Sequence, residues 1–432
     1  MKKDTARTCH EKVEDLGLIC TRLLVLLTVI NVSSTAADEF HYNNILIGDR
    51  ASGLGGAYTA ISDDASGLFY NPAGIAFTRD LQLSASANAV HTTKLTYKDV
   101  LNGGDWERES SNIVPNYFGI TNKIGDGYFG FSYAVTNFEV EDQDSRFTSI
   151  PNVPLYVINI NNVEKVTKLG PSYAVQLNDQ WNFGVTLYLH DRERELINNQ
   201  WIRLADDSYE WSNVYFEASE TGLEPVFGFI WSPSDVLSFG LTIRKVFISS
   251  SKSRTQVTCS SDVNNPLLQP SQCIQVGGSP IDPTITRSSD ERDLPLNVRF
   301  GIAYFPTERL LYTADISYYE ETSSDAFSAE EVINLALGLE YYYSARWALR
   351  AGYYTDKANT PDVSSTKLNQ LDHVDLKGIS LSMTHFSKTS SITFGMTYSA
   401  GDGKAQVITG SSQIQDLEQE ITTLYLSTTY NF

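Results

Sequence analysis

The last twelve residues, 421–432, alternate between apolar or aromatic and polar side chains and end in Phe432. Alternation gives a β-strand one apolar face with Leu424 and Leu426 and one polar face with Thr423 and Ser427. In an outer-membrane barrel these faces meet lipid and lumen. A soluble sandwich shows the same alternation, but a terminal Phe432 favours the barrel and marks the end expected to meet the barrel-assembly machinery.

Residues 1–36 have the organisation of a removable signal peptide. Basic residues precede an apolar run over 23–30, and a Ser34-Thr35-Ala36 cleavage pattern follows. A lipoprotein interpretation of Cys20 is disfavoured because Ile19 precedes it and the apolar run comes later. We therefore expect an exported mature chain.

No later segment holds about 18 consecutive apolar residues, so the sequence offers no transmembrane helix. A membrane protein without such helices must be a closed barrel, because lipid supplies no partner for an open sheet edge. The formal net charge of −20 argues against nucleic acid as a partner. The acidic residues are expected in solvated loops and in the lumen.

Short turns and long polar segments alternate beyond residue 80, as in a barrel with tight periplasmic turns and long outer loops. The predicted turns are 123–127, 178–180, 232–235, 306–309, 343–346 and 387–391. The predicted outer loops are 98–111, 142–154, 199–212, 250–286, 321–329, 357–373 and 401–417. These segments predict an all-β, antiparallel transmembrane barrel of about fourteen strands over residues 81–432.

The phase of the alternation also favours a barrel. Trp181, Leu187 and Leu189 share one face of their strand, while Thr186 and His190 share the other. A soluble sandwich shows the same alternation along its strands. The aromatic residues beside the predicted turns favour the barrel, because interfacial aromatic girdles lie at such positions. These residues are Tyr128, Trp181, Tyr304, Tyr341 and Trp347.

Five inward positions carry charge: Arg244, Arg299, Asp315, Glu340 and Arg350. They could contact substrate or a gate, or they could form ion pairs that hold the barrel interior together. Both interpretations stay open.

The exported chain keeps two cysteines, Cys259 and Cys273, within a polar segment. An even pair in an exported loop predicts a structural disulfide, and the spacing matches no zinc pattern. We expect no metal and no cofactor.

Residues 37–80 are unlike the rest, and 48–77 are rich in small residues. The residues singled out are Arg50, Gly53, Gly55, Gly56, Asp63, Asp64, Asn71, Pro72 and Ala73. Small residues permit tight packing in a confined space, and Asn before Pro favours a turn. Phosphate binding is disfavoured because the segment lacks the Lys and Ser/Thr of a P-loop.

This segment resembles the N-terminal hatch of the FadL family of outer-membrane transporters, through GDRASGLGGAY, then Asp63-Asp64-Ala65, then the NPAG turn at 71–74. It is also similar to the related PorV-like barrels. The resemblance implies a fourteen-stranded barrel whose lumen holds the hatch, and a ligand that leaves sideways through a break in the wall. It identifies no ligand contacts.

The scattered histidines form no catalytic constellation, so we expect no enzyme. The favoured function is passive uptake of long-chain fatty acids or other hydrophobic small molecules, by a monomer embedded in outer-membrane lipid. The alternative is a PorV-like barrel that docks or shuttles secreted proteins. An adhesive use of the acidic loops is a third possibility.

Overall fold

A computed structural model describes residues 40–78, 81–100, 104–150, 153–261, 283–324, 328–368, 370–407 and 412–432. The predicted signal peptide and Cys273 lie outside these residues. No helix in the described part of the chain is long and apolar enough to span a membrane.

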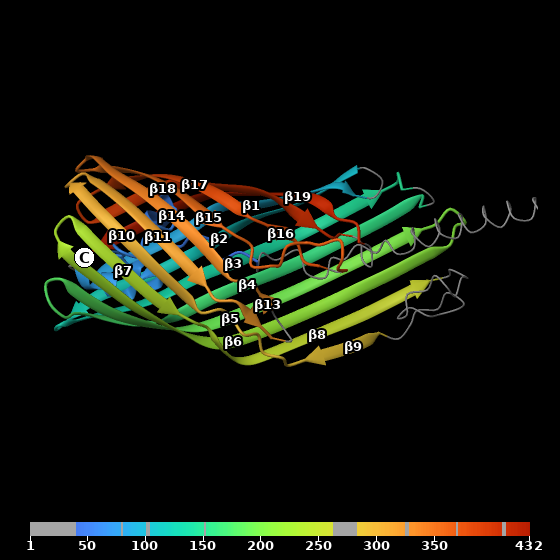
Figure 1. The fold of residues 1–432 in the computed structure, drawn as a ribbon, viewed down its shortest axis with the longest axis horizontal. Coiled ribbons are helices and arrows are strands. Elements are labelled where there is room, and N and C mark those ends of the chain that lie inside the picture. The colour runs from blue at the N-terminus through green and yellow to red at the C-terminus, as the bar shows by residue number, and fades with distance from the viewer. Residues whose placement is uncertain are drawn as a thin grey trace, which may run out of the picture.

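The chain forms a closed antiparallel β-barrel of fourteen strands (Figure 1). The first seven strands, two elements making up the seventh, are β1 (Gln82–Val100), β2 (Gly104–Ile124), β3 (Gly127–Phe147), β4 (Leu155–Gln176), β5 (Trp181–Arg203), β6 (Tyr209–Ser234), and β7 (Leu237–Arg244) with β8 (Phe247–Ser261). The other seven are β9 (Thr284–Ser288) with β10 (Asn297–Thr307), β11 (Leu310–Tyr319), β14 (Val332–Ser344), β15 (Trp347–Asp356), β16 (His373–Val374) with β17 (Leu376–Phe386), β18 (Ser390–Ala405) and β19 (Gln415–Asn431). A short hairpin, β12 (Thr322–Ser323) with β13 (Ser328–Ala329), lies apart from the main sheet.

Closure joins the first strand to the last. β1 pairs with β19 from Gln82↔Asn431 to Tyr97↔Leu417, and the N–H of Phe432 donates to the carbonyl of Leu81 at 3.0 Å. Closure satisfies edge backbone groups that lipid would leave without partners. The expected fourteen-stranded barrel is therefore confirmed.

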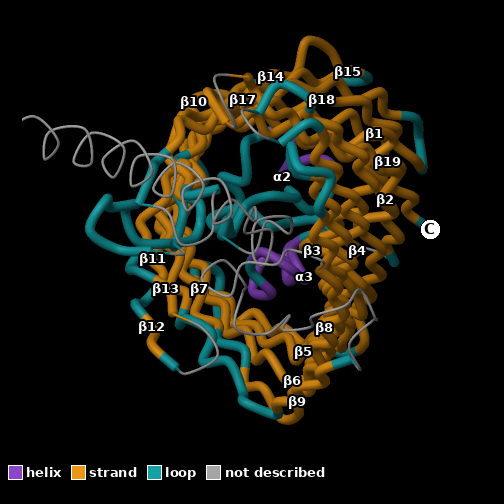
Figure 2. The backbone as a smooth tube through the Cα atoms, turned by 90° about the vertical axis from the view of Figure 1, so that its right-hand side faces the viewer, coloured by secondary structure: helices purple, strands orange, loops and turns teal. Residues whose placement is uncertain are grey.

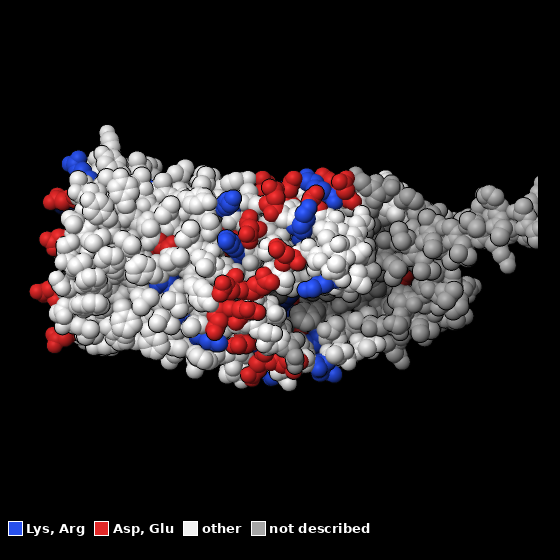
Figure 3. Space-filling view, viewed as in Figure 1, with Lys and Arg blue, Asp and Glu red and all other residues white. Residues whose placement is uncertain are grey.

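The outer face of the barrel carries an apolar band beside the short turns (Figure 3). Leu187, Leu337, Leu426 and Phe394 are among its exposed side chains. Beyond the band, toward the long loops, the surface becomes charged. We assign the short-turn end to the periplasm and the charged end to the cell exterior.

Several strands run farther outward than the sequence predicted. β2, β3, β5, β6 and β8 extend into the segments interpreted as the outer loops 98–111, 142–154, 199–212 and 250–286. His190 and Asp191 both lie within β5. The interpretation failed because it required an apolar outer face, which a strand needs only where it touches lipid.

The described N-terminal residues fold inside the ring of strands (Figure 2). They form α2 (Asp49–Gly53), α3 (Gly67–Tyr70) and the 3-10 helix η1 (Pro72–Phe77). Farther out, a second group of apolar side chains, including Tyr97, Trp106, Tyr156 and Ile158, fills the interior of the extended strands. The barrel interior is therefore packed at two levels.

The apolar band gives a test of orientation and depth. Leu426→Arg, on the lipid face midway along the spanning part of β19, should destabilise the barrel by about 2–4 kcal/mol. Asp402→Arg, exposed on β18 beyond the band, should change stability little. Urea unfolding in lipid bilayers measures both, and equal effects would contradict the assignment of the band.

Candidate functional site: the barrel interior and the β2/β3 seam

Inward-facing glycines make room for the N-terminal segment, residues 40–78. At Gly184 an added Cβ would lie 2.4 Å from the carbonyl carbon of Pro72, and at Gly228 it would lie 2.1 Å from Oδ1 of Asn71. The same close approach, under 3.0 Å, recurs on seven strands. We call these seven the glycine seat: Gly130, Gly184, Gly228, Gly240, Gly301, Gly338 and Gly352.

Polar side chains of the wall satisfy backbone groups of the N-terminal segment. The hydroxyl of Thr313 donates to the carbonyl of Ala57 at 2.7 Å, and that of Ser238 donates to Ala60 at 2.8 Å. Oδ2 of Asp315 accepts the N–H groups of Tyr58 and Thr59 at 3.0 and 2.9 Å. Buried backbone groups need such partners, so the irregular segment can lie inside the barrel.

Asn71 joins two parts of the N-terminal segment to the wall. Its Nδ2 donates to the carbonyls of Thr59 and Phe229 at 2.7 and 3.1 Å. Its Oδ1 accepts the N–H of Ala73 at 3.1 Å and caps η1, with Pro72 as the first residue. Proline suits that position because its missing N–H would have no partner there.

A buried charge cluster ties α2 to β14 and β15. Arg50 binds Glu340 through two hydrogen bonds of 2.8 and 2.9 Å and Asp63 at 2.5 Å. Nε of Arg350 lies 2.5 Å from Oε2 of Glu340, whose side chain is 1% exposed. Two predicted lumen charges and two predicted hatch residues therefore meet in one network.

The other singled-out residues lie nearby. Gly53 is in α2, and Gly55 and Gly56 follow it with φ of 66° and 83°, which favours glycine. Oδ1 of Asp64 accepts the N–H of Ser66 at 2.8 Å. Burial, with Asp49 close by, raises the pKa of Asp64 to about 6.

A cavity of about 210 Å³ lies between the N-terminal segment and β3–β10. One part of its lining is apolar, from Ile45, Leu46, Phe69, Leu294 and Pro295. The other part has six cationic side chains against two carboxylates, Glu164 and Glu224. The cationic residues are Lys168, Arg192, Arg244, Lys245, Arg292 and Arg299.

The two remaining predicted lumen charges, Arg244 and Arg299, face this cavity. Arg244 donates to the carbonyl of Phe69 and lies 3.7 Å from Glu224, which also binds Lys168 at 2.7 Å. The guanidinium of Arg299 lies 5.6 Å from the ring centroid of Tyr70. The cavity therefore offers cationic groups beside aromatic and aliphatic surface.

The barrel wall has a seam between β2 and β3. In the part of the chain that the structure describes, these strands pair only from Ile124↔Gly127 to Tyr117↔Ala134. Farther out, β2 pairs with β1, and β3 pairs with β4 as far as Phe147. Pro115 lies where the ladder stops, and proline supplies no N–H for a central strand.

The N-terminal segment closes this seam from the inside. Nδ2 of Asn116 on β2 donates to the carbonyl of Leu46 at 3.1 Å. Nδ2 of Asn44 donates to Oδ1 of Asn137 on β3 at 3.2 Å. Thr136 and Asn137 also line the cavity, so cavity, seam and N-terminal segment meet at one place.

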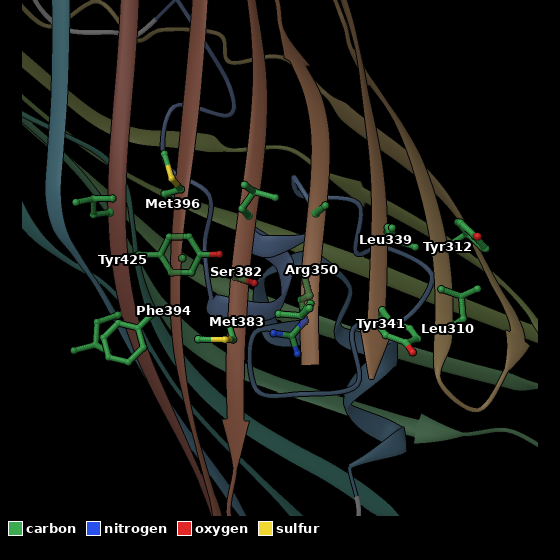
Figure 4. A pocket seen from close by; sticks show the side chains of 16 residues that line it. Leu310, Tyr312, Leu339, Tyr341, Arg350, Ser382, Met383, Phe394, Met396 and Tyr425 are labelled. Carbon is green, nitrogen blue, oxygen red and sulfur yellow. The ribbon is translucent and has the colours of Figure 1, made fainter. Parts of the chain in front are cut away.

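A larger hollow, about 1010 Å³, lies on the outer face of β11–β19. Figure 4 shows its lining, in which Leu310, Leu339, Met383 and Phe394 belong to the lipid face. Arg350 instead belongs to the charge cluster described above. This hollow is part of the lipid-facing wall, so it is not the candidate site.

Sequence reasoning missed several of these residues. Lys168, Glu224 and His190 were not singled out, although each occupies an inward position of an alternating strand. Pro115 was a visible signal, because proline within an alternating strand favours an edge or an interruption. No group of His, Cys, Asp and Glu side chains in the described ranges could hold a metal ion.

No protein-family model and no curated protein matches the sequence. Among solved structures, the chain is similar to the toluene transporter TodX of P. putida, with a TM-score of 0.64, 13% identity, and coverage of 89% of this chain and 98% of that one. A Pseudomonas aeruginosa FadL homologue matches with a TM-score of 0.61, 14% identity and coverage of 89% and 98%. The Ralstonia pickettii toluene transporter TbuX matches with a TM-score of 0.62, 12% identity and coverage of 90% and 100%.

The fold defines an outer-membrane β-barrel. In particular, it is the fold of the FadL-type channels, at sequence identities that establish the fold alone.

The glycine seat predicts an effect of one added methyl group. Gly228→Ala should push Asn71 off the wall, cost about 1–3 kcal/mol as other overpacking substitutions do, and raise conductance. Gly104→Ala is the control, because its nearest contact would be 4.0 Å away. Planar-bilayer recordings measure conductance, and an unchanged value for Gly228→Ala would contradict a plugging role.

The charge cluster predicts a large loss of stability. Glu340→Gln removes the buried carboxylate that Arg50 and Arg350 share and leaves two guanidinium groups close together, although Arg50 keeps Asp63. Unfolding should therefore become easier by about 3–5 kcal/mol. Asp416→Asn, which breaks the exposed pair with Lys404, should cost less than about 1 kcal/mol. Unfolding in detergent followed by tryptophan fluorescence compares them; similar losses would argue against the cluster as an anchor.

Proposed function

We propose that the chain is an outer-membrane channel for passive uptake of hydrophobic compounds, and that long-chain fatty acids are its substrates. The observation that carries the proposal is the cavity that lies against both the N-terminal segment and the β2/β3 seam. It combines apolar surface with a way out through the wall. The solved structures with this fold include a FadL homologue and toluene transporters, which supports a hydrophobic cargo.

The lining of the cavity favours a hydrophobic acid over a neutral hydrocarbon. Cationic side chains outnumber carboxylates in the lining, although Arg192, Arg292 and Lys245 also pair with Glu220 or Asp293 just outside it. The remaining excess attracts a carboxylate, and the neighbouring Ile45, Leu46 and Phe69 offer surface for an alkyl chain. In the described part of the chain neither ring nitrogen of His190 has a hydrogen-bond partner, although the residue is 4% exposed. A polar group on the ligand would supply such a partner.

The N-terminal segment acts as the hatch in this proposal. A ligand in the cavity competes with Asn44 and Leu46 for the space beside the seam, so binding and release of the seam are coupled. The ligand then leaves sideways between β2 and β3 into the apolar band. No step requires catalysis or a cofactor.

The test is uptake of a labelled long-chain fatty acid by cells that lack their own fatty-acid channel. We expect this chain to restore uptake, and replacement of Asn71-Pro72 to abolish it. Arg299→Gln should reduce uptake of the acid more than that of an alcohol with the same chain. Arg287→Gln, on the exposed outer side of β9, serves as the control.

Two results would contradict the proposal. No uptake from an assembled barrel would exclude this cargo, and a stable complex with a secreted protein would then favour the docking role. Equal loss of acid and alcohol uptake in Arg299→Gln would leave a hydrophobic channel without selectivity for acids.

A further inference from the structure

The β2/β3 seam is held at its outer end by side chains in place of a backbone ladder. We propose that Arg108 and Glu141 form a latch across this seam, and that Tyr97 connects the latch to Asp372 in the outer segment between β15 and β16. The inference rests on the proposed function in taking the seam as the route of the ligand. It adds a second closure, outside the one made by the N-terminal segment.

The geometry of the pair is that of a two-pronged ion pair. Nε and Nη2 of Arg108 lie 2.7 and 2.6 Å from Oε1 and Oε2 of Glu141. The side chains are 1% and 3% exposed, so water does not screen the attraction. Parallel hydrogen bonds from a planar guanidinium fix orientation as well as distance, and this contact therefore sets the spacing of the two strands.

Three further side-chain contacts cross the seam near the latch. Nε1 of Trp106 donates to Oγ of Ser145 at 2.9 Å, and Nε2 of Gln143 donates to the carbonyl of Glu107 at 3.1 Å. Oε1 of Gln143 accepts the N–H of Glu109 at 3.4 Å. Side-chain contacts can break without unpairing either strand, since β2 keeps its ladder with β1 and β3 keeps its ladder with β4. The seam can therefore open while the rest of the wall stays paired.

The latch and the ladder bound a window at the outer edge of the apolar band. The last ladder pair, Tyr117↔Ala134, closes its periplasmic end. Between the two closures, Ile113 on β2 is 74% exposed. The window therefore faces lipid, which is where a hydrophobic ligand would leave.

A chain of hydrogen bonds joins the latch to the segment between β15 and β16. Nη1 of Arg108 donates to the hydroxyl of Tyr97 at 3.2 Å, and this hydroxyl donates to Oδ2 of Asp372 at 2.9 Å. Asp372 immediately precedes β16. Displacement of the outer segment would remove the acceptor of Tyr97 and loosen the support of Arg108.

A buried ion pair suits a closure because it fixes the relative position of the two strands. Well-packed apolar residues would stabilise a buried contact as well or better, whereas a buried pair specifies one arrangement of the two strands. Where β2 and β3 have no backbone ladder, a closure needs a contact that holds the strands in one register and can still separate.

The test is the distance between nitroxide labels on Ser111 of β2 and Asp142 of β3, in a background with Cys259 and Cys273 replaced by serine. Both labelled positions are exposed. A second pair, on Asp142 and Asn161, spans the intact β3/β4 ladder and is the control. Dipolar broadening in continuous-wave electron paramagnetic resonance, which suits labels on neighbouring strands, gives both distances on the assembled, full-length mature barrel without ligand.

The main variant is Arg108→Met with Glu141→Leu, which removes both charges and leaves neither one buried alone. We expect the seam distance to lengthen and its distribution to broaden, with the control pair unchanged. The swapped variant, Arg108→Glu with Glu141→Arg, re-forms the ion pair without the bond to Tyr97, so its distribution should be narrower than that of the first variant. An unchanged seam distance in the first variant would overturn the latch.

The connection to the outer segment has its own variant. Tyr97→Phe removes the hydroxyl and keeps the ring, so we expect a broader seam distribution than in the unchanged chain. An unchanged distribution would overturn the link to Asp372. These distances are measured without ligand, so the two proposals can fail separately. A longer seam distance in the first variant, in a chain that takes up no fatty acid, would contradict the proposed function alone. Fatty-acid uptake by a chain whose seam distance does not change in that variant would contradict the latch alone.

Discussion

The hydrogen bonding of the backbone is the constraint on which the structure depends. A bilayer offers no partner to an N–H or a carbonyl, so every spanning strand must be paired on both sides. The pairing of β1 with β19 completes that requirement and leaves the described barrel without a free edge in the apolar band, except at the outer end of the β2/β3 seam. The exception is therefore informative, because it is where the wall departs from the rule that holds elsewhere.

The same constraint explains how the N-terminal segment can occupy the lumen. Irregular backbone is stable at membrane depth only where the protein satisfies its polar groups. Thr313, Ser238 and Asp315 do so from the wall, while the glycine seat lets the backbone approach closely enough for these bonds to form. The glycine seat and the hydrogen bonds together hold the N-terminal segment in the lumen, and the charge cluster around Arg50 fixes its orientation.

The polarity of the barrel interior changes from its outer part toward the N-terminal segment, and this change gives the proposed transport a direction. Apolar side chains fill the outer part, the cationic cavity lies between this packing and the N-terminal segment, and the seam lies beside the cavity. A ligand that is apolar along most of its length and anionic at one end matches this order. The ligand would match the chemistry of the cavity lining, and the β2/β3 seam is the path proposed for its exit.

The sequence determined the barrel, the number of its strands and the faces of their side chains, because the two-residue alternation and tight turns are local signals. It also singled out Arg50, Asp63, Glu340 and Arg350 without showing that they meet. The tertiary structure decided which charges pair and where the ladder stops. It placed Lys168 beside Glu224 and Arg108 beside Glu141, side-chain contacts that the alternation along a single strand does not specify. Outside the bilayer the apolar alternation ends because no lipid selects for it, so the true length of the strands also had to come from the structure.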